Sequence, residues 1–391
     1  MKIKEKYYRF AEKGQQIQRV NRFLITEYLI FYAFILFMLW ASRAKGVRSL
    51  GFAAFVSVIA VVSGGALLIG WKRHPESERL RYLALIGLYL VSFFMTFAYT
   101  ESVVVVDDAA YELYTYLDDV ADNYAKSINQ VAKNLDGKAD VYDLVIPLSS
   151  GITFPDNLRD EIKSSDQREA MTKIQDKMSD KVKSVDVYDT LMKHRDEYEY
   201  YRTDHHWTTL GAYYAYTDFC KAKGIEPEEL DSYDTKEFDG FLGSFYNDTS
   251  DAKLKKNPDV VTAYYPHNDS VMHVTASDGQ KYDWPVIYDV TNYGAALKYS
   301  AFIASDNPYT VIENKDLNDG SSCIVVKESF GNAFVPFLVD HYQKIYVIDY
   351  RYWTGSISKF AQENKVQDVL FLNNLSMIRN KSLVGKLHRV L

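Results

Sequence analysis

The chain has 391 residues, a formal net charge of -7 and two cysteines. This length is more than one ordinary domain needs, and the acidic balance argues against a nucleic-acid-binding surface, which is usually basic. Two cysteines are too few for a disulfide framework, so we expect Cys220 and Cys323 to be packed free thiols, with a single disulfide as the alternative.

Three apolar runs occupy the first hundred residues, at 23–41, 51–71 and 82–99. Each has about the length that crosses a ~30 Å hydrocarbon core as a helix. A cleaved signal peptide explains them poorly, because three runs follow one another and no small-residue cleavage site is evident. We therefore expect three transmembrane helices within residues 23–99, preceded by a short segment at 1–22.

Basic residues give the orientation of these helices. Seven lie before the first run and four between the second and third, whereas three lie between the first and second. Because segments rich in Lys and Arg stay in the cytoplasm, residues 1–22 are expected there. Three spans then place a domain at 107–391 outside the cytoplasm, anchored to the lipid bilayer of a plasma membrane.

The exported part reads as alternating elements. In chain order, the pattern predicts a helix from 107 to about Gly137, a strand at 141–150, a helix at 156–181, a strand at 185–189 and a helix at 209–222. Thr208 is a good N-cap for the last helix, and Gly224 ends it. Residues 230–310 are polar with weak short strands, and 239–248 reads as a loop.

The last part of the chain alternates more clearly. The expected elements are a strand at 323–329, a helix at 332–342, a strand at 344–350, a helix at 355–364 and a strand at 368–374. Continuous apolar strands that alternate with helices indicate an α/β fold with a parallel sheet covered on both faces. In such sheets, functional groups gather at the carboxyl ends of the strands.

One strand end carries a candidate nucleophile. The run "IVVKESFGN" places Ser329 between an apolar strand and a helix, which resembles the geometry of a nucleophile elbow. Backbone N–H groups of Phe330 and Gly331 are candidate oxyanion donors there. The alternative is that Ser329 only caps the helix that begins near Asn332.

A candidate base lies in "YYRTDHHWTTLGAYYAY" at 200–216. The residues before the helix cap are expected to be extended, so that side chains two apart share a face. Asp204 and His206 then lie together, and His205 and Trp207 point the other way. Asp204 can fix the tautomer of His206, which leaves the second ring nitrogen for a serine hydroxyl.

Two other interpretations of this stretch remain. Asp204, His205 and His206 have the chemistry of zinc ligands, but adjacent histidines rarely converge on one ion and no second histidine cluster is present. The sequence therefore predicts no metal and no cofactor. Two solvated histidines beside a helix cap are the second alternative.

These blocks, together with "VVKESFGNAFVPFL" and "YVIDYRYW", resemble the DHHW family of bacterial exported proteins. That family is similar to SGNH-hydrolase-like acetyltransferases, including exported proteins that O-acetylate alginate. The resemblance covers roughly 107–380. It implies an SGNH-hydrolase-like α/β domain in which Asp204, His206 and Ser329 form a triad. The chain departs from the family in carrying Glu328 where Asp is usual, and three spans where one anchor is usual.

The resemblance also implies a function. It predicts a serine O-acyltransferase that acetylates a cell-surface polysaccharide at the bacterial plasma membrane, supplied with acyl groups by a membrane-bound O-acyltransferase partner. A carbohydrate esterase with the same triad and a non-catalytic glycan-binding or sensory protein are the alternatives.

SGNH-like sites commonly add an asparagine to the oxyanion donors, for which Asn332 and Asn373 are candidates. Aromatic residues make up 15% of the chain, and tyrosine-rich surfaces can stack against sugar rings. The expected substrate-binding residues are Trp207, Tyr201, Arg202, Tyr246 and Asn373. The alternative is that the tyrosines pack in the core or lie at the membrane interface, and that Tyr201, Arg202 and Tyr246 are structural.

Overall fold

The computed structural model describes residues 103–391. They belong to a compact unit that spans Ser102–Leu391. The segment at 1–22 and the three expected membrane spans lie outside the described residues. Within 103–391, no helix combines the length and the apolar character that crossing a membrane requires.

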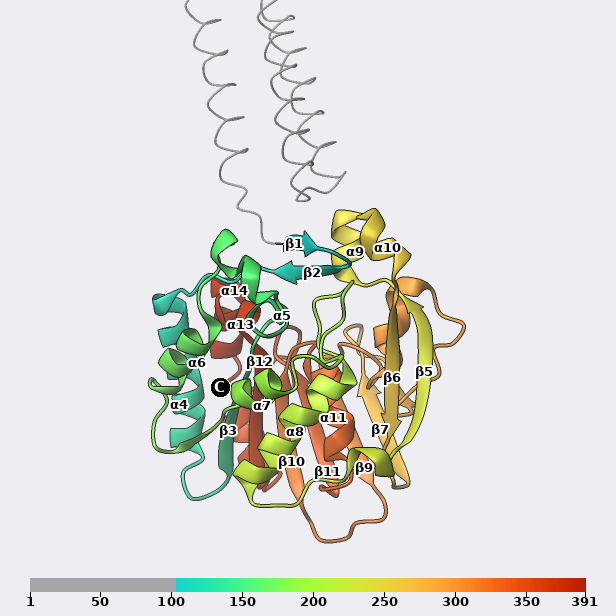
Figure 1. Cartoon of the computed structure of the whole chain (residues 1–391). Coiled ribbons are helices and arrows are strands. Elements are labelled where there is room, and N and C mark those ends of the chain that lie inside the picture. Colours follow the sequence, from blue (N-terminus) through green and yellow to red (C-terminus); the bar gives the residue numbers. More distant parts are fainter. Residues whose placement is uncertain (1–102) are drawn as a thin grey trace, which may run out of the picture. The chain divides into compact units, whose positions relative to one another are not determined.

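An eight-stranded sheet forms the centre of this unit (Figure 1). Across the sheet, the strands are β4 (Val182–Val185), β3 (Asp140–Ile146), β12 (Asp368–Asn374), β10 (Ser322–Lys327), β11 (Lys344–Asp349), β9 (Tyr309–Asn314), β7 (Ser270–Thr275) and β8 (Lys281–Trp284). The five strands from β4 to β11 are parallel. The last three are antiparallel to their neighbours. The fold is therefore α/β with a mixed sheet, and the expected parallel sheet forms only the half from β4 to β11.

The burial of the strands explains why the parallel half of the sheet could be predicted from the sequence and the antiparallel half could not. Every residue of β10 is buried, as expected for a parallel strand covered on both faces. In β9, buried residues alternate with half-buried ones, so one face is only partly covered. A short alternating strand among polar residues gives a weak signal, and the antiparallel half was for this reason read as irregular.

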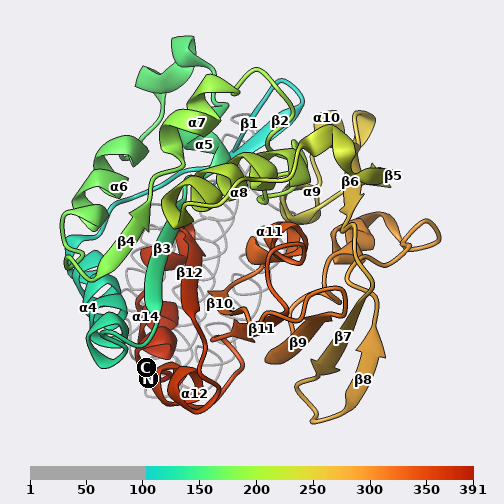
Figure 2. The same ribbon diagram turned by 90° about the horizontal axis from the view of Figure 1, so that it is seen from below.

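Helices cover both faces of the sheet. Their bounds are α4 (Asp118–Asn134), α5 (Ser149–Ile152), α6 (Gln167–Gln175), α7 (Tyr188–Lys193), α8 (Thr209–Lys223), α9 (Ser244–Thr249), α10 (Ala252–Lys256), α11 (Gly331–Leu338), α12 (Ile357–Glu363), α13 (Leu375–Ile378) and α14 (Lys381–His388), with 3-10 turns η1 (Asp156–Glu161), η2 (Leu230–Ser232) and η3 (Ala295–Ala301). Figure 2 shows α8 and α11 on one face, and α4, α12 and α14 on the other. The predicted cap Thr208 and stop Gly224 of α8 are confirmed.

Several expected boundaries differ from the structure. The helix expected from residue 107 begins at Asp118, because 103–112 forms a hairpin of β1 (Val103–Val106) and β2 (Ala109–Glu112). Asp107, with φ 51, provides the turn. The helix expected at 156–181 is divided into η1 and α6, and the strand expected at 185–189 is β4 at Val182–Val185.

The segment at 239–248, expected to be a loop, contains the end of β5 (Asp234–Phe241) and most of α9. Strand β5 pairs with β6 (Asp259–Tyr265) in a separate two-stranded sheet. This small sheet contacts η3 and lies beside the antiparallel half in Figure 1. The region from β5 to η3 becomes important at the candidate site.

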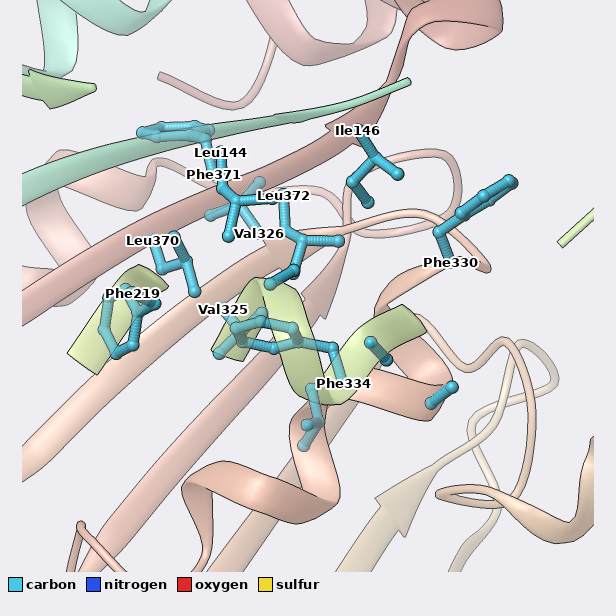
Figure 3. Close-up of a cluster of buried hydrophobic side chains, with 14 of the residues drawn as sticks. Leu144, Ile146, Phe219, Val325, Val326, Phe330, Phe334, Leu370, Phe371 and Leu372 are labelled. Carbon is cyan, nitrogen blue, oxygen red and sulfur yellow. The ribbon is translucent and has the colours of Figure 1, made fainter. Parts of the chain in front are cut away.

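The core holds the carboxyl end of β10 against α11. In Figure 3, Val325 and Val326 of β10 lie among apolar side chains of β12 and β3, with Phe219 of α8 and Phe334 of α11 against them. All of these side chains are fully buried, and burying one of this size stabilises the fold by about 1.5–3 kcal/mol. The turn between β10 and α11 is therefore firmly positioned.

Candidate active site

Ser329 lies on the tight turn between β10 and α11 and is half-buried, whereas Glu328 and Phe330 on either side are buried. The chain turns back so closely that a Cβ on Gly331 would lie 2.7 Å from the Cβ of Lys327. The position before α11 has no side-chain cap, so Ser329 does not cap this helix. Its hydroxyl is instead free to contact groups from other parts of the chain.

The stretch around His206 is a folded-back loop. Tyr200 and Trp207 form an antiparallel bridge, and the N–H of Tyr201 donates to the carbonyl of His206 over 3.2 Å. The expectation of an extended segment was therefore wrong. Because the chain turns, the rings of His205 and His206 lie side by side, with their centroids 3.9 Å apart, and do not face opposite ways.

Asp204 nevertheless pairs with His206, and the turn is the reason. One carboxylate oxygen, Oδ1, accepts the backbone N–H of His206 at 3.0 Å and lies 2.6 Å from its Nδ1. An aspartate that binds a backbone N–H two residues ahead is typical of an Asx turn. The two-residue spacing thus predicted the pairing of Asp204 with His206 correctly, although the backbone there is turned and not extended.

The second nitrogen of His206 points to the nucleophile. His206 Nε2 lies 2.7 Å from Ser329 Oγ. With Nδ1–H donating to Asp204, Nε2 is left to accept the serine proton, which is the arrangement of a Ser-His-Asp triad. Asp204 and His206 are buried, and Ser329 is partly open to solvent. The three residues that the sequence selected are therefore brought together.

The charge of Asp204 is well supported. Burial alone raises the pKa of this carboxyl, but His206, His205 and hydrogen bonds, including one of 2.7 Å from the Ser244 N–H to Oδ2, hold it well below its usual range. Burial and the neighbouring His206 lower the pKa of His205. His205 Nδ1 also lies 2.6 Å from Ser244 Oγ. The site thus contains a buried anion beside two adjacent imidazole rings, which are tilted by 35° relative to one another.

Three residues that support this pair were missed in the sequence. Gly243 packs against Asp204 so closely that a Cβ there would lie 2.3 Å from Oδ2. Ser244 supplies the N–H described above. Tyr299 of η3 stacks on His206 with a centroid distance of 4.1 Å and donates its hydroxyl to the Ser329 carbonyl over 3.0 Å. The Gly-Ser pair was the one local signal, and it was read as part of a loop.

The expected oxyanion groups surround Ser329 but already have partners. The N–H of Phe330 donates to Glu328 Oε2 at 3.1 Å. The N–H groups of Gly331 and Asn332 donate to the carbonyls of Glu328 and Ser329. Burial raises the pKa of Glu328, although Arg351 and two backbone N–H groups oppose this. An oxyanion on these donors would have to displace their present acceptors, so their role stays a prediction.

The side chain of Asn332 belongs to a buried charged network. It accepts from Lys327 Nζ at 2.5 Å and donates to Asp306 at 3.1 Å. Arg351 contacts both Asp306 and Asp349, at 2.7 and 2.6 Å. These bonds tie the ends of β10 and β11 to the chain before β9 and fix the start of α11. They engage the oxygen and one N–H of the Asn332 amide. Because the amide has a second N–H, its role as an oxyanion donor stays a prediction.

The expected substrate-binding residues are mostly internal. Trp207 is fully buried and donates its indole N–H to the carbonyl of Phe330 over 3.0 Å. Tyr201 and Asn373 are also buried, and Asn373 donates to Tyr124. Burial leaves these three no surface for a glycan, so that part of the expectation was wrong.

The remaining two expected residues are half-buried. Arg202 lies 3.4 Å from the carboxylate of Asp259. Tyr246 packs beside Ala110 and Phe245. Neither arrangement tests contact with substrate, so both stay predictions.

The possible metal ligands lie close together, and the two thiols are buried. One potential ligand atom from each of Asp204, His205 and His206 lies within 4.8 Å of the others. The expectation that no metal binds there is untested. Both cysteines are buried and free, as expected.

Comparison with known proteins places the chain in a family and identifies proteins with a similar structure. A family model described as "DHHW protein" matches residues 95–348. The structure of a DHHW family protein from Eubacterium siraeum DSM 15702 is 30% identical, covers 74% of this chain and 95% of that chain, and has a TM-score of 0.67. Bacillus cereus PatB1 with a sulfonyl adduct shares the fold at 20% identity, with 74% and 98% covered and a TM-score of 0.61. Curated proteins gave no match.

Proposed function

This chain belongs to the DHHW family, and we propose that it is a serine O-acyltransferase in which Ser329, His206 and Asp204 transfer an acetyl group to a polysaccharide. The observation that carries the proposal is the continuous contact from Ser329 Oγ to His206 Nε2 (2.7 Å) and from His206 Nδ1 to Asp204 (2.6 Å). Serine is a weak nucleophile unless a base removes its proton, and this contact supplies the base.

The reaction would proceed in two steps, acylation of Ser329 and transfer of the acetyl group to the sugar. Ser329 Oγ attacks the carbonyl of the acyl donor while its proton passes to His206 Nε2, and the leaving group departs with that proton to give an acetylated Ser329. A sugar hydroxyl then attacks the acetyl carbonyl and gives its proton to His206, and Ser329 recovers a proton as the sugar ester forms. Asp204 holds the imidazole and stabilises its cationic form throughout.

The acceptor and the donor follow from the family and the expected topology. An exported acyltransferase has no cytoplasmic acetyl donor, so a membrane-bound O-acyltransferase would deliver acetyl groups to it. The acceptor would be a cell-surface polysaccharide. Both assignments depend on the membrane spans expected within 23–99.

A sulfonyl fluoride offers a direct test of the nucleophile. The PatB1 structure carries a sulfonyl adduct, and an activated serine in this chain should react in the same way. We expect phenylmethanesulfonyl fluoride to modify the full chain once, at Ser329, as located by peptide mass spectrometry. Ser329→Ala and His206→Ala should remove this modification, and an unmodified wild-type Ser329 would contradict the proposal.

Activity is measured with 4-nitrophenyl acetate, with and without an oligosaccharide acceptor. Ser329→Ala should lower turnover by about 10³-fold or more. Ser356→Ala is a matched control, because Ser356 is a true helix cap that accepts the Lys359 N–H. It should cost about 1 kcal/mol of stability and keep its activity.

The products separate the alternatives. Acetylated sugar supports the transferase, and acetate without acetylated sugar supports an esterase with the same triad. Equal turnover by wild type and Ser329→Ala would favour a non-catalytic protein.

A further inference from the structure

Four aromatic side chains follow one another at the outer edge of the mixed sheet. Tyr282 and Trp284 lie on β8 with ring centroids 6.0 Å apart. Trp284 lies 4.5 Å from Tyr288, and Tyr288 lies 5.7 Å from Tyr293. We call these four residues the aromatic strip. The triad and its supporting residues do not include any of them.

Two residues of the strip are packed against the core, and the other two are exposed. β8 is the outermost strand on this side of the sheet (Figure 2). Trp284 and Tyr288 are half-buried and pack against the core, whereas Tyr282 and Tyr293 are 39% and 38% exposed. Contiguous exposed apolar groups are a feature of interaction and ligand-binding sites, whereas singly scattered ones need no explanation.

Two carboxylates beside the strip have local partners, and one exposed lysine, Lys281, precedes Tyr282. Asp283 lies 2.6 Å from the His273 ring, and Asp289 lies 2.8 Å from Lys236. Aromatic surfaces that bind single-stranded nucleic acid lie in positively charged grooves, which this surface does not provide. Rings with hydroxyl and indole groups but little free charge suit an uncharged ligand with flat apolar faces and many hydroxyls.

The strip is continuous with the candidate active site along the chain. The segment after β8 is held to the end of η3 by a 2.8 Å bond from the Tyr288 N–H to the Ala301 carbonyl. The start of η3 accepts a bond from Leu242, next to Gly243. Between these two anchors, η3 carries Tyr299, which contacts both His206 and Ser329.

We propose that the aromatic strip binds the acceptor, a neutral polymer of pyranose sugars, and leads it toward Ser329. The apolar C–H faces of successive sugar rings would stack on the exposed faces of Tyr282 and Tyr293, and the sugar hydroxyls would stay solvated. This inference rests on the proposed acyltransferase function, because it assigns the substrate class of the same site.

Binding is tested without an acyl donor, so the result does not depend on catalysis. Cellohexaose and the hexamer of β-1,4-linked N-acetylglucosamine are titrated calorimetrically into the full chain, in a detergent without a sugar headgroup. We expect both hexamers to bind, and cellobiose to bind more weakly because it spans fewer rings. The double variant Tyr282→Ala/Tyr293→Ala should weaken hexamer binding by about tenfold.

Tyr352→Ala is the matched control, since Tyr352 is 51% exposed and lies outside the strip. It should bind the hexamers as the wild type does. The inference is overturned if neither hexamer binds the wild type, if the double variant binds equally well, or if Tyr352→Ala weakens binding as much. It is also overturned if the double variant alters only the oligomeric state, which would assign the strip to a second copy. A chain that binds hexamers but reacts neither with the ester nor with the sulfonyl fluoride would refute the proposed function alone.

Discussion

The parallel half of the sheet and the segment from β5 to η3 contribute differently to the candidate site. The parallel half presents Ser329 on a turn held by the buried core of β10 and α11. The segment from β5 to η3 contributes Gly243, Ser244 and Tyr299, which contact Asp204, His206 or the Ser329 backbone. The nucleophile is thus fixed by dense packing, and its base by a few close contacts from a peripheral region. Mutations in the two regions should therefore give separable effects.

The largest loss of turnover should come from replacing Asp204, the carboxylate that contacts both His206 and the segment from β5 to η3. Asp204→Asn keeps the size of the side chain but removes the anion and favours the wrong tautomer of His206. We expect turnover of the acetyl ester to fall by about 10³–10⁴-fold with the fold retained. Turnover is measured by nitrophenol release and the fold by circular dichroism. A loss of less than tenfold would show that Asp204 is not the partner of the base.

A buried acid of the parallel half should affect stability without affecting the chemistry. Burial raises the pKa of Asp143 to about 7, although a hydrogen bond from Tyr124 opposes this. Between the ordinary value near 3.8 and about 7, the folded chain binds a proton that the unfolded chain releases. Stability from this group is present at low pH and is lost as pH rises through that window.

Asp143→Asn removes this titration and can keep the bond from Tyr124. At pH 8 the variant should be more stable than wild type by a few kcal/mol, on the order of the pKa shift, and the difference should shrink toward pH 4. Chemical denaturation at several pH values measures it. A stability difference that does not vary with pH would mean that Asp143 titrates normally.

The same division explains how much the sequence could predict. Strands such as β10 are continuous apolar runs followed by a helix, so their ends, and hence Ser329, could be located from local pattern. Asp204 and His206 were paired because they lie two residues apart, although the loop geometry was wrong. Gly243 and Tyr299 could not be found, because their roles arise from contacts 39 and 93 residues away from Asp204 and His206 in the chain. The antiparallel strands were obscure because β7 and β9 each have buried residues on one face only, and β8 has none.

Gly243 offers a way to disturb the base from the peripheral side. A Cβ there would lie 2.2 Å from the Cβ of Asp204, so Gly243→Ala must displace the carboxylate or its own loop. A displacement of about 1 Å is enough to lower turnover by about 10²-fold. Gly385→Ala is the control, because nothing lies within 4 Å of its added Cβ. Equal turnover in the two variants would show that the contact does not position Asp204.

The smallest effect should come from a single hydroxyl at the same border. Tyr299→Phe keeps the ring stacked on His206 but removes the 3.0 Å bond to the Ser329 carbonyl. One such bond contributes about 0.5–1.5 kcal/mol, so turnover should fall by about two- to tenfold. Tyr299→Ala should lower it further, because the stacked ring is lost as well.

Tyr213→Phe provides the matched control for this hydroxyl. Tyr213 on α8 also donates its hydroxyl to a backbone carbonyl, that of Glu228 at 3.1 Å, and it is buried away from the triad. Both tyrosine variants should lose comparable stability, but only Tyr299→Phe should lose turnover. If both lose turnover equally, the effect is one of general stability, and the segment from β5 to η3 does not specifically position the site. If only Tyr299→Phe does, that segment sets the position of the nucleophile's backbone as well as that of the base.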